Sequence, residues 1–336
     1  MKKYLLLLLL PCYIFAQNKI DTTPKVFGNI ITWYQSDLQA SQWQFVIKEA
    51  RLGIKGNINE YFAYNLQNDF ARSITKSDKA GDIDTLDQSL ADAAVILNPI
   101  SNLNFTMGQF VIPFGIENQK PASDQEFLNK SLIYKNISTG LRDIGVMGTY
   151  TTDLNIGLPM DFRLGFFNGN GQDKTETDKR TNVVFRYSVT PAKAFSLTGS
   201  AYSGTLSKNK VSILAGGAEY TINNIKFTSE VAKRTTTDSV GTFDGTAYYI
   251  DALYNLEISG SMITYLVPGI RFDYLEPKST KASDEFSRLT TGLTLQFAKM
   301  HAAQFRINYE YFIYKDKSTN KLLHPSQLMF CMIAKF

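Results

Sequence analysis

The sequence is poor in cysteine, in long apolar runs and in excess charge, and each shortage excludes a class of protein. Two cysteines in 336 residues are too few for a disulfide scaffold. Beyond the N-terminus, no stretch approaches the roughly 20 apolar residues that a membrane-spanning helix requires. The formal net charge of +4, from 35 basic and 31 acidic side chains, is too small to indicate nucleic-acid binding.

Aromatic side chains are abundant, by contrast. The chain contains 2 Trp, 18 Tyr and 23 Phe, and 44% of its residues are hydrophobic. This many apolar residues bury a large surface on folding, which excludes a disordered chain. Because Tyr and Phe favour strands, the composition indicates a β-rich protein.

The N-terminus has the pattern of a secretory signal peptide. Lys2 and Lys3 precede an unbroken thirteen-residue apolar run that ends at Ala16. This run is too short to span a bilayer, but it matches the apolar core of a signal peptide. We therefore predict that residues 1–16 direct export and that residues 17–336 form a single mature domain.

From about residue 25 onward, apolar residues alternate with polar ones at a period of two, which predicts strands. The clearest segment, 304–314, carries its apolar side chains at odd-numbered positions. These segments are about ten residues long, the length that a tilted membrane-spanning strand requires. Sixteen of them follow one another: 25–35, 44–57, 60–70, 88–97, 102–110, 144–152, 161–169, 181–190, 194–205, 211–222, 224–234, 245–256, 262–274, 287–298, 303–314 and 327–336.

The connections between these segments fall into two groups. Most of those after odd-numbered segments are long and polar: 36–43, 71–87, 111–143, 170–180, 235–244, 275–286 and 315–326, with 206–210 as the short exception. Those after even-numbered segments are tight. A meander barrel with short periplasmic turns and longer outer loops predicts this asymmetry.

The last segment adds a second indication of a barrel. Its apolar residues alternate from Leu328 up to the terminal Phe336. Outer-membrane barrels commonly end in this way, so we expect the barrel-assembly machinery to recognise Phe336. Because a bilayer offers no water to unpaired backbone groups, the strands must close into a ring. The sequence thus predicts an all-β, antiparallel transmembrane β-barrel of about 16 strands.

Four segments resemble the phosphate-selective porin O and P family: 51–69 (RLGIKGNINEYFAYNLQND), 105–117 (FTMGQFVIPFGIE), 142–150 (RDIGVMGTY) and 162–171 (FRLGFFNGNG). The resemblance implies a sixteen-stranded outer-membrane porin that forms a homotrimer. It also implies that the third outer loop, which follows the fifth strand, folds into the lumen. The longest predicted connection, 111–143, independently lies after that strand.

Loop 111–143 contains the first set of candidate selectivity residues, namely Lys120, Lys130, Lys135 and Arg142. If the loop folds inward, these cations stand at the narrowest point and concentrate anions there. The loop also contains four acidic residues: Glu117, Asp124, Glu126 and Asp143. The alternative is therefore a solvated loop in which opposite charges pair.

The polar phase of the strands supplies a second set of candidates. Basic residues on it are Arg51, Lys55, Arg163, Arg186, Lys226, Arg234, Arg271, Arg288 and Arg306; acidic residues are Glu49, Asp69, Glu230, Asp251, Asp273 and Glu310. Guanidinium groups suit phosphate oxygens. We take Arg51, Arg163, Arg186, Arg271 and Arg306 as anion-selectivity candidates and expect a mild anion or phosphate preference.

No motif indicates an enzyme, a metal site or a cofactor. The two histidines, His301 and His324, fall in predicted connections and match no catalytic triad. The stretch 168–171 (NGNG) is read as a hairpin turn, because no helix follows it as a phosphate cradle would need. The acidic stretch that contains Asp78, Asp82, Asp84 and Asp87 matches no calcium loop.

Two functions remain open on the sequence. The first is an outer-membrane porin, a water-filled channel for passive diffusion of small hydrophilic anions such as phosphate. Its partners would be outer-membrane lipid, the barrel-assembly machinery and two further copies of the chain. The alternative is an exported β-rich protein that binds glycans or mediates adhesion without forming a channel.

Overall fold

The computed structural model describes residues 20–39, 42–71, 89–138, 140–154, 156–175, 179–206, 208–258, 262–281, 283–297, 303–318 and 324–336. The predicted signal peptide lies outside these residues, as do the four aspartates of the acidic stretch and His301.

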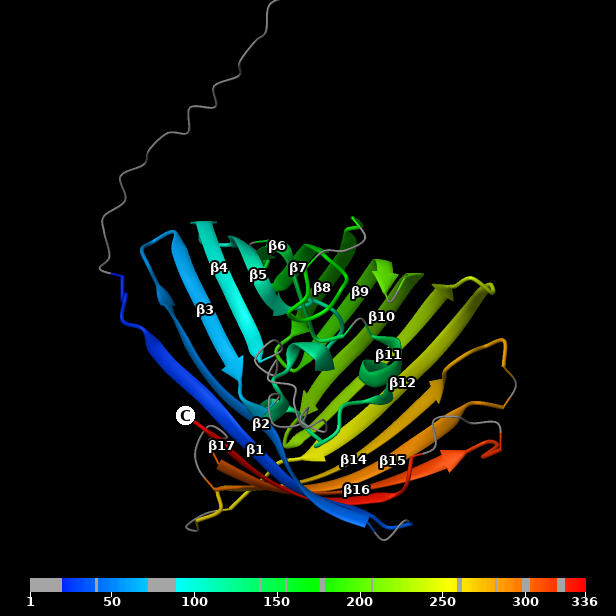
Figure 1. The fold of residues 1–336 in the computed structure, drawn as a ribbon. Coiled ribbons are helices and arrows are strands. Elements are labelled where there is room, and N and C mark those ends of the chain that lie inside the picture. The colour runs from blue at the N-terminus through cyan, green and yellow to red at the C-terminus, as the bar shows by residue number, and fades with distance from the viewer. Residues whose placement is uncertain are drawn as a thin grey trace, which may run out of the picture.

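The described chain forms one antiparallel sheet that closes on itself, because β17 pairs with β1 (Figure 1). The two-residue strand β13 pairs with the same strand as β12 and continues it, so sixteen strands form the wall. The strands are β1 (Lys25–Asp37), β2 (Gln42–Asn57), β3 (Phe62–Asp69), β4 (Leu90–Ile100), β5 (Leu103–Val111), β6 (Arg142–Thr152), β7 (Met160–Phe167), β8 (Asn182–Ala192), β9 (Phe195–Leu206), β10 (Asn209–Ile222), β11 (Ile225–Thr237), β12 (Thr242–Tyr254), β13 (Leu256–Glu257), β14 (Tyr265–Glu276), β15 (Phe286–Gln296), β16 (Ala303–Tyr314) and β17 (Gln327–Lys335). The predicted strand number is confirmed.

The period of two places successive side chains on opposite faces of the wall. In β16, Tyr309 and Tyr311 are exposed on the outside, whereas Asn308 and Glu310 are buried inside. Large apolar side chains are exposed around much of the outer wall, as contact with lipid requires. The predicted phase of this strand is therefore confirmed.

The two groups of connections are also present. The strand ends that the longer connections 70–89, 112–141, 168–181, 277–285 and 315–326 join share one side of the barrel, and most connections on the other side are short. Two predicted long connections are wrong, however. Because β1, β2, β11 and β12 extend further than expected, only 38–41 and 238–241 join them.

The barrel closes beside its C-terminus. The N–H of Gly28 donates to the Phe336 carbonyl (3.0 Å), and the N–H of Phe336 donates to the Gly28 carbonyl (3.1 Å). A Cβ on residue 28 would lie 2.6 Å from Cζ of Phe336, so glycine at this position leaves room for the terminal ring.

The connection 112–141, which we name the lumen loop, lies inside the barrel (Figure 1). It contains three short helical turns: η2 (Glu117–Gln119), η3 (Ala122–Asp124) and η4 (Ile133–Ile137). None of the described helices is long or apolar enough to cross a membrane.

One expectation about the inner face is corrected by this loop. The sequence assigns water to the whole inner face, but part of that face is apolar. Val184, Ile213, Leu275 and Phe286 are buried on it, together with Phe114, Leu132, Ile133 and Ile137 of the lumen loop. Burial of this apolar surface stabilises the loop in the lumen.

Candidate functional site

Five arginines of the wall hold the lumen loop in place. Each donates a hydrogen bond to it: Arg163 to the Gln119 side chain (3.2 Å), Arg186 to the Gly115 carbonyl (3.0 Å), Arg271 to Glu117 (2.8 Å), Arg288 to the Lys130 carbonyl (2.8 Å) and Arg306 to the Ser123 carbonyl (2.8 Å). These arginines come from β7, β8, β14, β15 and β16. The loop is thus fixed against five strands of the wall.

Arg271 forms the centre of this attachment. Its guanidinium pairs with Glu117 (2.8 Å) and Asp251 (2.7 Å), and it lies between the rings of Phe127 and Tyr249, 4.7 and 4.6 Å from their centroids. Burial of Glu117 disfavours its charge, but Arg271 and hydrogen bonds from Ser131 outweigh burial and lower the pKa of Glu117. Glu117 therefore remains ionised and holds the loop electrostatically.

A second ionic cluster fixes the first half of the loop. The Lys120 ammonium pairs with Glu126 (2.7 Å) and with Glu219 of β10 (2.8 Å), and Lys226 of β11 also reaches Glu126 (2.8 Å). Burial acts to raise the pKa of Glu126, but the two lysines outweigh it and lower this pKa to about 2. Lys120 thus serves first to attach the loop.

Although Ala122 and Leu128 of the loop also pack near Trp33 of β1, open space remains between the loop and β1–β4. Two cavities occupy it. The outer chamber, on the side of the long connections, has about 410 Å³ and is lined by residues that include Gln35, Gln44, Lys48 and Tyr134. The inner chamber has about 400 Å³ and is lined by residues that include Lys55, Asp92, Arg142 and Lys335. Glu49, Arg51 and Lys130 line both chambers, so they mark the junction between them.

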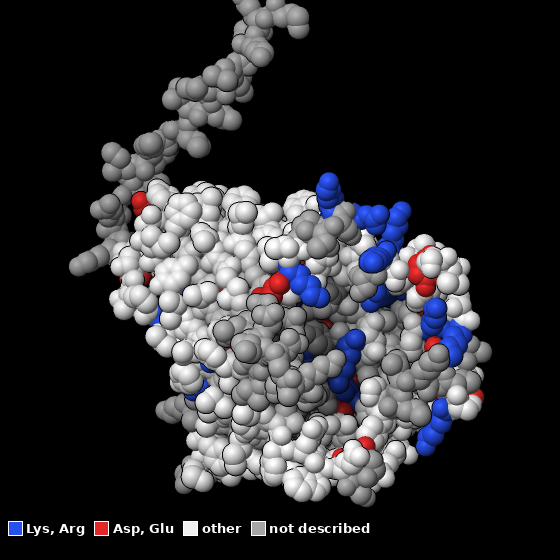
Figure 2. Space-filling model, viewed as in Figure 1, with Lys and Arg blue, Asp and Glu red and all other residues white. Residues whose placement is uncertain are grey.

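Basic side chains outnumber acidic ones along this path. Of the described residues that line the two chambers, eight are basic and four are acidic; the basic ones are Lys48, Arg51, Lys55, Lys120, Lys130, Lys135, Arg142 and Lys335, and the acidic ones Glu49, Asp69, Asp92 and Asp124. On the face shown in Figure 2, Lys and Arg gather at the rim and in the hollow, whereas the side over β1–β4 is largely uncharged.

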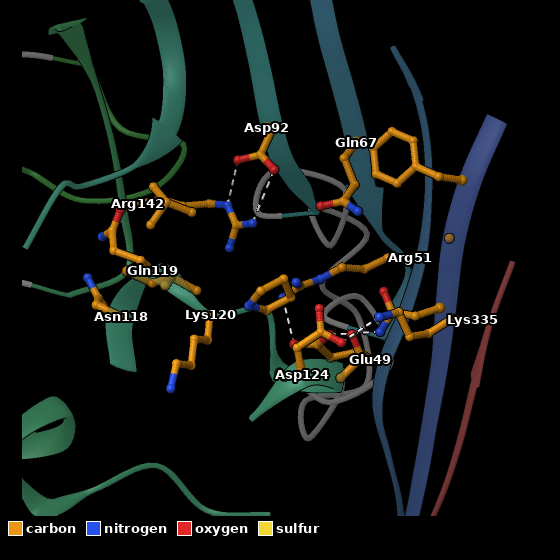
Figure 3. A pocket seen from close by; sticks show the side chains of 18 of the residues that line it. Glu49, Arg51, Gln67, Asp92, Asn118, Gln119, Lys120, Asp124, Arg142 and Lys335 are labelled. Atoms are coloured by element: carbon orange, nitrogen blue, oxygen red, sulfur yellow. Dashed lines mark hydrogen bonds and ion pairs between the residues drawn. The ribbon is translucent and has the colours of Figure 1, made fainter. Parts of the chain in front are cut away.

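The two arginines of the path are held by carboxylates. Arg142, at the start of β6, forms two hydrogen bonds to Asp92 of β4 (2.8 and 3.2 Å), and Figure 3 shows the pair at the edge of the inner chamber. Arg51 of β2 pairs with Glu49 (2.7 Å) and Asp69 (3.1 Å). These pairs fix the guanidinium planes but reduce the net charge beside them.

Lys130 differs from both arginines. Its ammonium nitrogen is buried, lies 3.8 Å from the centroid of the Tyr134 ring, and has no hydrogen-bond partner among the described residues. Burial lowers the pKa of Lys130 to about 8, although Glu117 and Glu49 act in the opposite direction. Burial and Arg288 likewise lower the pKa of Lys135, which lines the outer chamber.

The structure thus divides the predicted candidates into two groups. Arg51, Lys120, Lys130, Lys135 and Arg142 line the open path, whereas Arg163, Arg186, Arg271 and Arg306 contact the loop from the far wall. Arg271 is only 1% exposed, so it belongs with the attachment of the loop. Arg306 also borders a third cavity, of about 450 Å³, near Lys226 and Gln296.

Two lysines of the path were missed by the sequence analysis. Lys48 is the extra residue at a β-bulge, where Ile31 pairs with Glu49 but Thr32 pairs with Ile47. A bulge shifts the alternation by one residue and hides the phase from the sequence. Lys335 is one of the odd-numbered residues of the last strand, which face inward. The alternation of that strand could therefore have identified Lys335 as an inward-facing cation.

Two other sequence features have structural roles. Gly169 and Gly171 have positive φ angles of 84° and 83°, and the NGNG stretch begins the long connection between β7 and β8, so the expected hairpin turn is not formed there. His324 packs against Phe312 and Phe286, with ring centroids 5.2 and 6.1 Å apart, and burial lowers its pKa.

A closed sixteen-stranded barrel, with apolar side chains outside and a loop-narrowed path inside, defines a channel of the outer membrane. The family of phosphate-selective porin O and P matches residues 33–253, and the chain belongs to this family. The predicted porin class and outer-membrane location are therefore confirmed, and the alternative of a glycan-binding or adhesion protein without a channel is not supported. No curated protein matches the chain.

Solved structures with similar folds share little sequence with the chain. It is similar to OmpT of Vibrio cholerae in its trimer form, with 14% identity and a TM-score of 0.63 over 94% of this chain and 99% of that one. An anion-selective porin from Comamonas acidovorans matches with 12% identity and a TM-score of 0.66 over 94% and 99%. OmpF of Salmonella typhi, in complex with daunomycin, matches with 15% identity and a TM-score of 0.63 over 93% and 97%.

Proposed function

We propose that the protein is a passive channel that prefers small anions, phosphate among them, and that solutes pass between the lumen loop and β1–β4. The observation that carries the proposal is Lys130, a cation without a hydrogen-bond partner at the junction of the two chambers. In a narrow, low-dielectric passage, such a charge attracts anions and repels cations. The excess of basic side chains around both chambers supports the same preference.

Reversal potentials across a planar bilayer, measured in a potassium chloride gradient, test this proposal. We expect the sign that indicates chloride preference, and we expect Lys130→Gln to reduce its magnitude. Lys233→Gln serves as the control, because Lys233 is 58% exposed and pairs with Asp244 away from the two chambers. A clear cation preference of the unaltered channel would refute the proposal.

We further propose the assembly and processing of the chain. The trimeric form of the Vibrio cholerae protein and the shared fold support a homotrimer in outer-membrane lipid.

The apolar run that ends at Ala16 supports cleavage of a signal peptide before Gln17, which N-terminal sequencing of the exported protein tests. The proposed channel function requires only that solutes diffuse through the barrel, and no catalysed reaction is part of it.

A further inference from the structure

We propose that the outer chamber selects sugar phosphates, in which a phosphate monoester is attached to a hydroxylated ring, over inorganic phosphate. This inference rests on the proposed anion channel and names the class of solute that its outer half fits. The geometry that carries it is the change in side-chain chemistry along β1 and β2: neutral amides come first, then an apolar wall beside Lys48, and then a charged end that contains Arg51 and Lys130 as well as Glu49 and Asp69.

Cross-strand pairs between β1 and β2 show this order. Asp37 pairs with Gln42 at the outer end of the two strands. In the same phase, Gln35 pairs with Gln44 one step further in, and Trp33 pairs with Val46 one step beyond that. Asn29 pairs with Arg51 deeper still, where the two chambers meet. Because side chains alternate along a strand, these pairs all face the lumen.

The outer end of the chamber presents two available amides. Gln35 is half-buried and Gln44 is exposed to the lumen, and neither side chain forms a hydrogen bond within the part of the chain that the structure describes. A primary amide offers two donors and an acceptor, which matches the donor and acceptor character of sugar hydroxyls.

The middle of the chamber has an apolar wall, and the Lys48 ammonium lies 4.8 Å from the centroid of its Trp33 ring. Val46 and Leu128 pack with buried Trp33, and the Tyr134 ring lies on the same cavity. The C–H face of a sugar ring can contact such a wall without loss of hydrogen bonds, whereas a bare phosphate ion gains nothing from it.

The inner end of the chamber carries cations together with the carboxylates of Glu49 and Asp69, which pair with Arg51. The Lys130 ammonium stands there without a hydrogen-bond partner among the described residues, and Lys135 lines the same cavity. A volume of about 410 Å³ falls within the range of about 300–1,000 Å³ typical of small-molecule sites, so the chamber is larger than an inorganic ion needs. Two neutral hydrogen-bonding groups at the opposite end favour a hydroxylated ring over an aromatic carboxylate.

Block of the single-channel chloride current tests the inference. Glucose 6-phosphate, glucose and inorganic phosphate are added in turn to the side of the long loops. We expect glucose 6-phosphate to block at a half-blocking concentration about tenfold below that of inorganic phosphate, because two additional hydrogen bonds form. Glucose alone should block far more weakly. Equal half-blocking concentrations for the two phosphates would overturn the inference.

Variants locate the effect. The double variant Gln35→Leu/Gln44→Leu should raise the half-blocking concentration of glucose 6-phosphate about tenfold and leave that of inorganic phosphate unchanged. Gln67→Leu is the matched control, because Gln67 lines only the inner chamber of the two. If the double variant does not assemble, Gln44→Leu alone removes the exposed amide. An equal loss in the control, or no loss in either amide variant, would overturn the assignment to this chamber.

The same recordings separate this inference from the proposed function. A reversal potential that indicates cation preference would refute the anion channel itself. Anion preference without discrimination between glucose 6-phosphate and inorganic phosphate would refute only the sugar-phosphate assignment.

Discussion

Lys130 is a residue of the proposed path whose charge depends on pH. Burial lowers the pKa of its ammonium to about 8, so it is charged below that pH and neutral above it. We therefore predict that anion preference is greatest at pH 6 and falls as pH rises through about 8. Reversal potentials measured from pH 6 to 9.5 check this expectation.

Lys130→Arg is the control for that titration. A guanidinium remains protonated over the whole range, so this variant should keep its anion preference at pH 9.5. A decline of equal size in the variant would place the titrating group elsewhere in the path.

Arg271 is a residue whose loss should affect stability. Its removal leaves two buried carboxylates, Glu117 and Asp251, without their partner. We predict that Arg271→Ala destabilises the barrel by about 3–5 kcal/mol, as expected for an uncompensated buried charge. Guanidinium unfolding in detergent micelles measures the change.

The matched control is Lys233→Ala, which removes an exposed pair with Asp244 on the outer surface. Such pairs contribute about 0–1 kcal/mol. Similar unfolding midpoints for the two variants would contradict the role assigned to Arg271.

At the scale of elements, β17 combines closure of the barrel with the predicted assembly signal. Phe336 exchanges two backbone hydrogen bonds with Gly28, yet its side chain is 65% exposed. We predict that deletion of Phe336 reduces the amount of folded barrel in outer membranes, because recognition by the assembly machinery is impaired. Refolding of the purified chain into detergent should remain possible. Membrane fractionation and refolding yield are the two measurements.

Phe336→Tyr keeps an aromatic terminus and is expected to assemble normally. Loss of both assembly and refolding on deletion would show that the residue acts through stability alone.

The lumen loop is the element that determines the shape of the path. Its apolar residues, such as Phe114 and Ile133, pack on one part of the inner wall, and wall arginines hold its backbone. Open space remains along β1–β4 and also in the cavity beside Arg306, between the loop and β11–β16. The loop therefore decides which of the inward-facing charges meet a solute.

At the scale of the whole molecule, the apolar outer surface should make the mature protein dependent on detergent. We predict that an unheated sample migrates faster on a mildly denaturing gel than a heated one, because the closed barrel resists unfolding. Chemical cross-linking in detergent is expected to yield a trimer. A mature chain that stays dissolved and monomeric in plain buffer would contradict both the barrel and its assembly.

Much of this architecture could be read from local sequence pattern. Alternation in segments such as 304–314 gives strand number and facing, because the side-chain period of a strand is independent of distant contacts. Bulges limit the prediction of which side chains face inward. At Lys48, one extra residue in β2 reverses the alternation of inward-facing and outward-facing side chains. Loop bounds were least accurate where strands are longer than the sequence pattern predicts, as at 38–41 and 238–241.

The sequence by itself determined a closed barrel with lipid outside, because each strand records its own two faces and a bilayer permits no open edge. The sequence also identified the candidate cations, but it could not show which of them attach the lumen loop and which line the chambers. Only the tertiary structure shows that Arg271 and Arg306 hold the loop whereas Lys130 lies where the two chambers join. The reason is physical: which carboxylate or carbonyl each cation reaches depends on contacts between residues more than a hundred positions apart, and no local pattern encodes them.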